Sequence, residues 1–172
     1  MNITGGICKG RKIKSPDEKI VRPTLSKVRM SVFNVLYSLL GTFKNLSFLD
    51  MFGGSGIMGL EALSRGFEKV TVFEKNRTVA EIIRSNYKTL GFSPDLKIGD
   101  SIKLAEKETN KFDVVYIDPP YMSDIYENSL KKAPSKNIII LEHTTELDLS
   151  EYKILKQKKY GDKYLTFLSI NK

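Results

Sequence analysis

Residue types that would build a metal site or a disulfide are scarce in this sequence. It contains one cysteine, Cys8, and one histidine, His143. A single cysteine excludes an intrachain disulfide and a cysteine-based zinc cluster, and a single histidine excludes a histidine metal cluster. We therefore expect no metal site and a reducing, intracellular compartment, with the cytoplasm as the default.

Long apolar stretches are also missing. No run approaches the roughly 18 residues that a membrane span needs. The first residues, Met1 to Gly6, lack the apolar core of a signal peptide. We therefore expect no membrane partner.

Acidic residues are outnumbered by basic ones. The 172 residues include 28 Lys and Arg against 20 Asp and Glu, which gives a formal net charge of +8. A basic excess favours acidic partners such as nucleic acid, an anionic membrane surface or phosphorylated substrates. The length suits one domain with a sizeable core. We expect a single domain over 1–172, with a basic N-terminal hairpin extension over 1–25 and a catalytic core over 26–172.

Apolar patterning predicts alternating strands and helices. A first helix is predicted over 26–40 and ends at Gly41. Strands are predicted over 46–52, 70–73, 96–98, 112–117 and 138–141, and helices over 56–65, 79–90, 102–107 and 125–132. Two strand-like runs, 152–160 and 163–170, flank Gly161-Asp162 and indicate an antiparallel hairpin. The predicted fold is an α/β three-layer sandwich around a mostly parallel, seven-stranded sheet.

A glycine-rich turn follows the first of these strands, with the sequence Asp50-Met51-Phe52-Gly53-Gly54-Ser55-Gly56. Glycines at a strand-to-helix junction let the backbone turn tightly and let a ligand approach the main chain. Gly54, Gly56 and Gly59 fit the pattern G-x-G-x-x-G, and Glu74 follows at the distance of a ribose-binding acid. The turn is compatible with a nicotinamide or flavin dinucleotide and with S-adenosylmethionine.

In the S-adenosylmethionine interpretation, one carboxylate follows each of the first three strands. Asp50 faces the methionine end, Glu74 accepts from the ribose hydroxyls, and Asp100 accepts from the adenine amine. Ligands bind outside the carboxyl ends of strands in open α/β sheets, where these acids are predicted to lie. The predicted cofactor-binding residues are Asp50, Phe52, Gly53, Gly54, Ser55, Gly56, Glu74, Lys75, Asp100 and Ser101.

The segment Asp118-Pro119-Pro120-Tyr121, after the fourth strand, distinguishes between these cofactors. An exocyclic base amine is a poor nucleophile because its lone pair is delocalised into the ring. Asp118 and a backbone carbonyl of the rigid proline pair can accept its two hydrogens, and Tyr121 can stack on the base. Methyl transfer then needs mainly in-line positioning. A dehydrogenase has no evident use for these four residues, which are the predicted catalytic set of an N-methyltransferase.

These motifs resemble the class I methyltransferases, and further ones resemble the RsmD family. The further motifs are Gly5-Gly6, Gly10-Arg11-Lys12, Arg22-Pro23-Thr24, Arg29, Phe33-Asn34, Leu60 to Gly66 and Tyr160-Gly161-Asp162. The resemblance covers nearly the whole chain. Gly53 departs from it by standing where the family usually has Ala, and the segment between Tyr121 and Ile138 is shorter than usual.

The resemblance implies a Rossmann-like class I fold, S-adenosylmethionine as cofactor, and methylation of a guanine N2 in small-subunit (16S) ribosomal RNA. The implied partner is 16S rRNA or the assembling small ribosomal subunit, and we expect a monomer. The residues implied to meet RNA are Lys9, Arg11, Lys12, Arg22, Thr24 and Arg29.

Three other functions remain compatible with parts of the sequence. A DNA adenine-N6 methyltransferase would use the same tetrapeptide, although no separate target-recognition domain fits this length. A non-catalytic assembly factor would keep the cofactor fold without the reaction. A dinucleotide oxidoreductase would bind NAD at the glycine turn.

Other polar residues receive simpler interpretations. Cys8 is expected to be a small, partly buried side chain, His143 a structural residue, and Glu142 an exposed acid at a strand end. The lysines of the C-terminal hairpin are expected either to extend an RNA-binding face or to protect a sheet edge from aggregation. These are Lys156, Lys158, Lys159 and Lys163.

Overall fold

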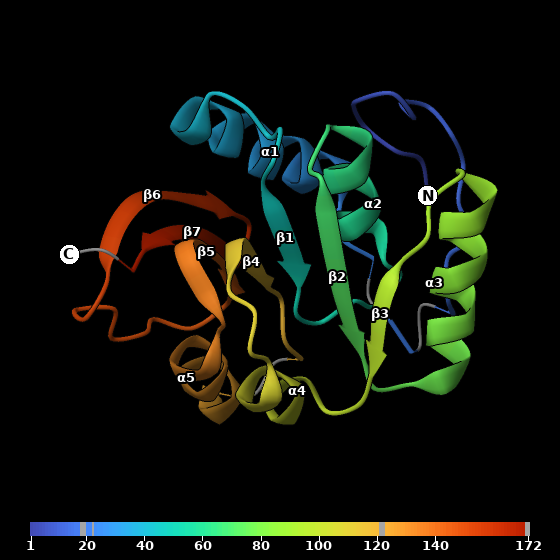
Figure 1. Ribbon diagram of the computed structural model, residues 1–172. Helices are drawn as coiled ribbons and strands as arrows, with labels where there is room; N and C mark the ends of the chain where they lie inside the picture. The colour runs from blue at the N-terminus through green and yellow to red at the C-terminus, as the bar shows by residue number, and fades with distance from the viewer. Residues whose placement is uncertain (18–19, 22, 121–122, 171–172) are drawn as a thin grey trace.

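A computed structural model describes residues 1–17, 20–21, 23–120 and 123–170. Helices and strands alternate along the chain as far as β5, as the apolar patterning predicted, and two further strands follow (Figure 1). The helices are α1 (Ser26–Leu40), α2 (Ile57–Ser64), α3 (Arg77–Thr89), α4 (Ser101–Lys107) and α5 (Ser123–Lys132). The strands are β1 (Ser47–Asp50), β2 (Lys69–Glu74), β3 (Asp95–Ile98), β4 (Phe112–Ile117), β5 (Ser135–His143), β6 (Lys153–Tyr160) and β7 (Lys163–Ser169).

These strands form one seven-stranded sheet in the order β3-β2-β1-β4-β5-β7-β6. Strands β1 to β5 are parallel, whereas β7 pairs antiparallel with both β5 and β6. The predicted mostly parallel sheet with an antiparallel C-terminal hairpin is confirmed. The second strand of the hairpin is the inner one, so the start of β7 lies beside the carboxyl end of β5, where His143 pairs with Tyr164.

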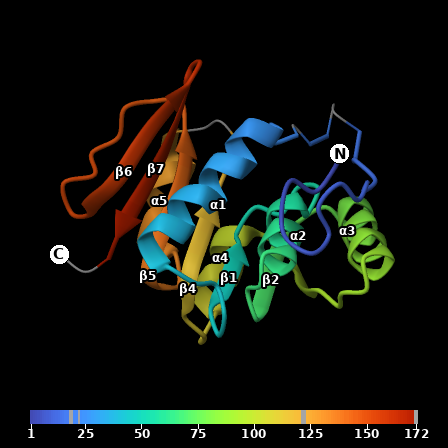
Figure 2. The same ribbon diagram turned by 90° about the horizontal axis from the view of Figure 1, so that it is seen from above.

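Helices cover both faces of the sheet, as the two ribbon views show (Figures 1 and 2). Helices α1, α2 and α3 enclose one core, and α4 and α5 enclose the other. Along β4, Val114 and Tyr116 belong to the first core, and Val115 and Ile117 to the second. A strand buried on both faces has no solvent-exposed face, so its residues do not alternate between apolar and polar, which explains the continuous apolar run in the sequence.

Helix α1 begins and ends where its apolar spacing predicted. Gly41 ends it with φ of 72°, and the Gly41 N–H donates to the carbonyl oxygen of Tyr37. Glycine reaches this left-handed conformation without a steric penalty. None of the helices in the described ranges is both long and apolar enough to cross a membrane.

The described residues 1–17 form a loop that packs on the helices rather than a two-stranded extension. The predicted hairpin is reduced to one antiparallel bridge, between Asn2 and Lys12. Gly6 and Gly10, with φ of 76° and 83°, turn the chain out of the extended conformation that strands need. Ile3 is buried in the core below α1, α2 and α3, so this segment is part of the domain's packing.

Candidate functional site

A cavity of about 520 Å³ lies where β1, β2 and β4 end. This volume is in the range of small-molecule sites, and the carboxyl edge of an open α/β sheet is where such sites form. All the predicted cofactor-binding residues except Gly56 line it. Asp118, Pro119, Pro120 and Thr24 line it as well. The structure therefore brings most of the predicted site residues together.

The glycine turn between β1 and α2 forms one wall, and its glycines have different roles. Gly54 has φ of 53°, and Gly56, the N-cap of α2, has φ of 74°. A Cβ at Gly53 would lie 2.4 Å from Val72 Cγ1, so the turn packs directly on β2. Gly56 was predicted to bind the cofactor, but it does not line the cavity. Glycine is required there by the left-handed turn and by the close approach of Ile83, which would lie 3.0 Å from a Cβ at this position.

Glu74 ties this turn to the end of β2. Its Oε2 accepts a hydrogen bond from Gly54 N at 2.9 Å, and its Oε1 accepts one from Asn76 N at 2.7 Å. The side chain is buried but lines the cavity. Because each carboxylate oxygen can accept more than one hydrogen bond, Glu74 can also accept from a ribose hydroxyl.

Asp50 is a buried acid whose side chain makes no hydrogen bond of normal geometry with the described residues. It is 1% exposed, and neither carboxylate oxygen is hydrogen-bonded within the described ranges. Burial raises the pKa of Asp50 well above its ordinary value, and the charges of Asp118 and Glu74 add to the rise. The backbone N–H groups of Phe52 and Gly59 lie near enough to lower the pKa in part, although neither makes a hydrogen bond of normal geometry to the carboxylate. A buried carboxylate in this state is costly, and a cationic ligand group in the cavity would satisfy it.

The turn after β3 contributes Asp100, Ser101 and the start of α4. Asp100 caps this helix, since its Oδ1 accepts from Lys103 N at 3.0 Å. Both Asp100 and Ser101 line the cavity. A carboxylate has about four lone-pair sites, so capping leaves Asp100 with further capacity to accept from a ligand amine.

The segment after β4 enters the same cavity. Pro119 is buried, Pro120 is exposed, and the side chain of Asp118 is 21% exposed. Asp118 is close enough to Asp50 to raise the pKa of Asp50 by its charge. Tyr121 lies outside the described residues, so its stacking role stays a prediction.

Lys163 also lines this cavity and is paired with Glu142, although the sequence interpretation assigned neither residue to the site. Lys163 Nζ lies 2.6 Å from Glu142 Oε2 and 3.8 Å from Asp118 Oδ1. The Tyr116 hydroxyl donates to Glu142 Oε1 at 3.1 Å. The expectation of an exposed acid at 142 is wrong: Glu142 is 2% exposed, because β7 pairs alongside this end of β5. Lys163 is likewise a cavity residue and not an edge lysine.

Cys8 and His143 lie away from the cavity lining. Cys8 is buried in the core, and its N–H donates to Ser64 Oγ. The His143 ring is hydrogen-bonded to the Thr145 carbonyl oxygen at 2.7 Å and to Thr166 Oγ1 at 2.9 Å. Both contacts are those of structural residues.

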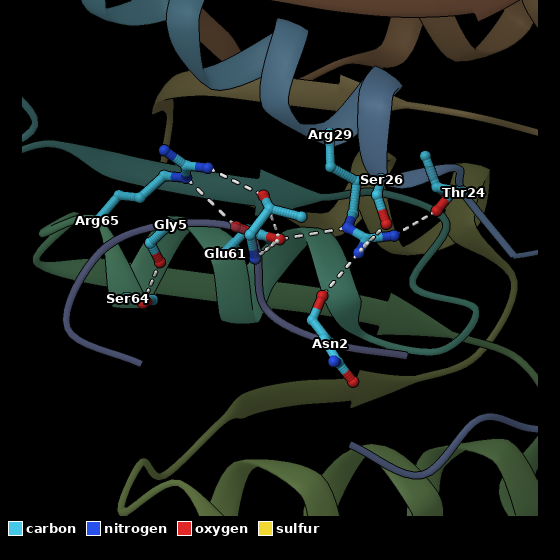
Figure 3. A network of polar contacts seen from close by, with 9 residues as sticks. Asn2, Gly5, Thr24, Ser26, Arg29, Glu61, Ser64 and Arg65 are labelled. Carbon is cyan, nitrogen blue, oxygen red and sulfur yellow. Dashed lines mark hydrogen bonds and ion pairs between the residues drawn. The ribbon is translucent and has the colours of Figure 1, made fainter. Parts of the chain in front are cut away.

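Arg29, predicted to contact RNA, lies instead in a buried polar network (Figure 3). Its Nε lies 3.2 Å from Glu61 Oε1, and its Nη2 donates to the Asn2 carbonyl oxygen at 2.7 Å. Its Nη1 donates to the carbonyl oxygen of Thr24. The predicted RNA contact is therefore wrong, because the guanidinium is 2% exposed and is used inside the protein. Phe33, one turn along α1 and also buried, is the sequence signal for this face.

Glu61 completes this network from α2. Its Oε1 also accepts from the N–H and the hydroxyl of Thr4, both at 2.7 Å, and its Oε2 lies 3.3 Å from Arg65 Nε. Figure 3 shows these contacts converging from the N-terminal segment, α1 and α2. The network thereby fastens the backbone of Thr24, a cavity residue, to the core of the domain.

The other predicted RNA contacts are distributed over two edges of the molecule. Among these predicted contacts, the exposed basic residues are Lys9, Arg11 and Lys12. Arg11 Nη2 donates to the carbonyl oxygen of Thr89, at the carboxyl end of α3. That end of α3 lies at the amino edge of the parallel sheet, whereas Thr24 is at the cavity. Arg22 lies outside the described residues.

The charge of the cavity discriminates between the two cofactors that the glycine turn allowed. Asp50, Glu74 and Asp118 make its centre acidic. A dinucleotide would bring an anionic pyrophosphate toward these carboxylates, whereas S-adenosylmethionine brings a sulfonium and an ammonium group. The acidic cavity therefore fits the cationic S-adenosylmethionine better than a dinucleotide.

This strand order, with an antiparallel strand inserted beside β5 and an acidic cavity at the carboxyl edge, defines the class I methyltransferase fold. The family model described as conserved hypothetical protein 95 matches residues 1–169. The chain therefore belongs to this family, the RsmD family.

Individual relatives agree with this assignment. The chain is 30% identical to ribosomal RNA small subunit methyltransferase D of Haemophilus influenzae, over 94% of this chain and 89% of that protein. It is 34% identical to the Escherichia coli K12 protein of the same name, over 76% of this chain and 65% of that protein. A solved structure of a hypothetical protein from Thermus thermophilus matches with a TM-score of 0.82 and 25% identity, covering 97% of this chain and 98% of that one.

Proposed function

We propose that this protein uses S-adenosylmethionine to methylate the exocyclic N2 amine of a guanine in small-subunit ribosomal RNA. The observation that carries the proposal is the shared cavity of Asp118-Pro119-Pro120 with Asp50 and Glu74. The names of the relatives, ribosomal RNA small subunit methyltransferase D, support RNA as the substrate. Guanine N2 follows from the RsmD resemblance. We expect action in the cytoplasm, on 16S rRNA or on the assembling small subunit.

The chemistry requires the amine lone pair to be localised while the methyl group arrives. Asp118 is proposed to accept one amine hydrogen, and a backbone carbonyl of the Pro119-Pro120 unit the other. Prolines lack an N–H and have a fixed φ, so this turn offers acceptors with few competing donors. S-adenosylmethionine, when bound, supplies an electrophilic methyl group. The protein then contributes alignment of the amine and exclusion of water, not a covalent intermediate.

The cofactor would be held mainly by three acids. Asp50 would pair with the amino group, which relieves the cost of its unpartnered burial. Glu74 is already fixed by two backbone N–H groups and would accept from the ribose. Asp100 would accept from the adenine amine beside the start of α4.

RNA is proposed to meet the basic N-terminal segment. Lys9, Arg11 and Lys12 are exposed there and would contact phosphates, which positions the substrate without reading its sequence. Because these residues lie near the amino edge of the sheet, an RNA that contacts them must also wrap toward the cavity. Thr24, which lines the cavity, is the proposed contact there, and Arg22 is proposed as a further RNA contact.

The direct test is transfer of labelled methyl groups from S-adenosylmethionine to undermethylated small-subunit RNA or particles. Asp118→Ala is expected to lower the rate about 10²–10³-fold, as loss of one preorganised hydrogen-bonding group does in other active sites. Asp148→Ala, which removes an exposed acid outside the cavity lining, is the matched control and is expected to keep the rate.

Three outcomes would contradict the proposal. Incorporation that survives Asp118→Ala and Tyr121→Ala unchanged would reject the assigned mechanism. Methylation of DNA adenine without methylation of RNA would identify the adenine-N6 alternative. Absence of S-adenosylmethionine binding in calorimetry would favour an assembly factor, or an oxidoreductase if NAD binds instead.

A further inference from the structure

A chain of polar contacts runs across the ends of three neighbouring strands beside the cavity. It begins with Tyr116 on β4, passes to Glu142 on β5 and then to Lys163 on β7, and returns to Asp118 at the end of β4. Glu142 is 2% exposed and the Lys163 side chain 17% exposed. These contacts are therefore largely shielded from water, which strengthens them.

The two contacts of Lys163 differ in length. Lys163 Nζ is within hydrogen-bond distance of Glu142 Oε2, at 2.6 Å, but 3.8 Å from Asp118 Oδ1. At 3.8 Å the ammonium attracts the Asp118 carboxylate without a normal hydrogen bond to that oxygen. The ammonium of Lys163 thus attracts the Asp118 carboxylate and biases its orientation.

Tyr116 and Glu142 fix the position of Lys163. Burial raises the pKa of the Tyr116 hydroxyl well above its ordinary value, and the charge of Glu142 adds to the rise. The phenol therefore keeps its proton and donates to Glu142 Oε1. Glu142 in turn holds Lys163 with its other oxygen.

The charge balance of the cavity gives Lys163 a second effect. Asp50, Glu74 and Asp118 line the cavity, and Glu142 lies directly behind Lys163. Carboxylates that share one cavity repel one another. A cation between Glu142 and Asp118 offsets that repulsion at the end of the cavity assigned to the target amine.

We propose that Lys163 is a positioning residue for the amine-binding carboxylate of Asp118, with Glu142 and Tyr116 as its support. The inference rests on the proposed function, because Asp118 is assigned to the amine there. It adds three residues from different strands to the machinery of that reaction. All three lie outside the Asp118-to-Tyr121 segment in the sequence and are linked to it by contacts in the folded structure.

The test separates positioning from folding with one single and one double variant. Lys163→Met leaves Glu142 buried without its cation, so a loss of stability is expected as well as a loss of rate. Lys163→Met with Glu142→Gln removes both charges, and the glutamine can keep its hydrogen bond with Tyr116. We expect this double variant to recover the wild-type melting temperature while its single-turnover methylation rate stays about 10–100-fold low. Its affinity for S-adenosylmethionine should stay within about twofold of wild type, since none of the acids assigned to the cofactor is changed.

Two further variants sharpen the result. Lys163→Arg keeps a cation between the two carboxylates and is expected to recover most of the rate. Lys69→Met removes an exposed lysine at the amino end of β2, on the opposite edge of the sheet, and is expected to keep the full rate.

The outcomes distinguish this inference from the proposed function. Suppose that the wild type is active, that Asp118→Ala inactivates it, and that the double variant keeps the wild-type rate. This result would overturn the inference about Lys163 and leave the proposed function standing. A double variant that loses cofactor affinity in step with rate would also overturn it, because the defect would then be a collapsed cavity. A wild type that methylates no base amine would overturn the proposed function and this inference together.

Discussion

Two buried acids, Asp50 at the end of β1 and Glu61 within α2, lie on either side of the glycine turn, and their surroundings are opposite. Glu61 is 0% exposed, and its two oxygens are bonded to Thr4, Arg29 and Arg65. Asp50 is 1% exposed, and its oxygens have no hydrogen-bond partner within the described part of the chain. The same chemical group is thus satisfied in one place and left unsatisfied in the other.

The difference separates structure from function. A buried carboxylate with several donors joins segments of the fold, as Glu61 joins the N-terminal segment, α1 and α2. A buried carboxylate without donors destabilises the free protein, and a bound cation would satisfy it. Asp50 lines the cavity and Glu61 does not, so the unsatisfied acid is the one that faces a ligand.

The largest expected effect is on stability, from Glu61→Ala. This change leaves the buried guanidinium of Arg29 without its carboxylate, at a cost of about 3–5 kcal/mol. The melting temperature should fall by roughly 6–20 °C, at about 2–4 °C per kcal/mol for a domain of this size. Circular dichroism on heating measures it, with exposed Glu68→Ala as the control. Equal melting temperatures for the two variants would contradict the claim that Glu61 stabilises the fold.

The next effect is on cofactor affinity, from Glu74→Ala. Glu74 holds the backbone of Gly54 and Asn76, and its proposed ribose contact is a charge-assisted hydrogen bond. The dissociation constant for S-adenosylmethionine, measured by calorimetry, should rise about 10–100-fold. RNA affinity should change much less. A loss of RNA affinity with unchanged cofactor affinity would show that Glu74 is wrongly placed.

Asp50→Asn is expected to change stability and binding in opposite directions. The neutral amide avoids burying a charge, so the free protein should gain about 1 kcal/mol, or roughly 2–4 °C in melting temperature. The affinity for S-adenosylmethionine should fall about tenfold, because the amino group loses its anionic partner. A variant that melts lower than wild type would mean that Asp50 supports the fold as Glu61 does.

The pH dependence of stability gives an independent check on Asp50. Its pKa is raised in the folded state, chiefly by burial, so its protonated form favours folding. The contribution of this group is complete below its unfolded pKa of about 3.9 and is lost as the pH rises through the folded pKa. The free energy of unfolding of the wild type, relative to that of Asp50→Asn, should therefore decrease as the pH rises from about 3.9 through the folded pKa. A difference that stays constant with pH would contradict the assigned shift.

The smallest expected effects concern the exposed basic residues. Arg11→Ala with Lys12→Ala should reduce the salt dependence of RNA binding by about 0.7–0.9 for each phosphate that is no longer bound, with little change in melting temperature. Arg29→Ala should lower the melting temperature and leave the salt dependence of RNA binding nearly unchanged, since Arg29 is buried. Binding titrations at several salt concentrations measure the slope. Equal slopes for wild type and the double variant would exclude these residues from RNA contact.

Local sequence patterns predicted the fold and the first half of the cavity well. The predicted bounds of β4 agree with the structure because it is buried on both faces, and those of α1 agree because Gly41 ends a regular apolar spacing. Asp50 and Glu74 could be placed because parallel strands bring their carboxyl ends to one edge.

The sequence did not predict contacts that depend on tertiary pairing. Arg29 meets Glu61 from another helix, and nothing local distinguishes it from an exposed arginine except its helical spacing from Phe33. Lys163 reaches Asp118 only because β7, and not β6, lies beside β5. The order of the strands within the C-terminal hairpin could not be inferred from its apolar alternation.

The most direct test of the central claim is mass spectrometry of nucleosides from the small-subunit RNA of cells with and without this protein. The account predicts that N2-methylguanosine decreases in cells lacking the protein and returns when the wild-type chain is supplied, but not when Asp118→Ala is supplied. Unchanged N2-methylguanosine, or loss of N6-methyladenosine in its place, would contradict it.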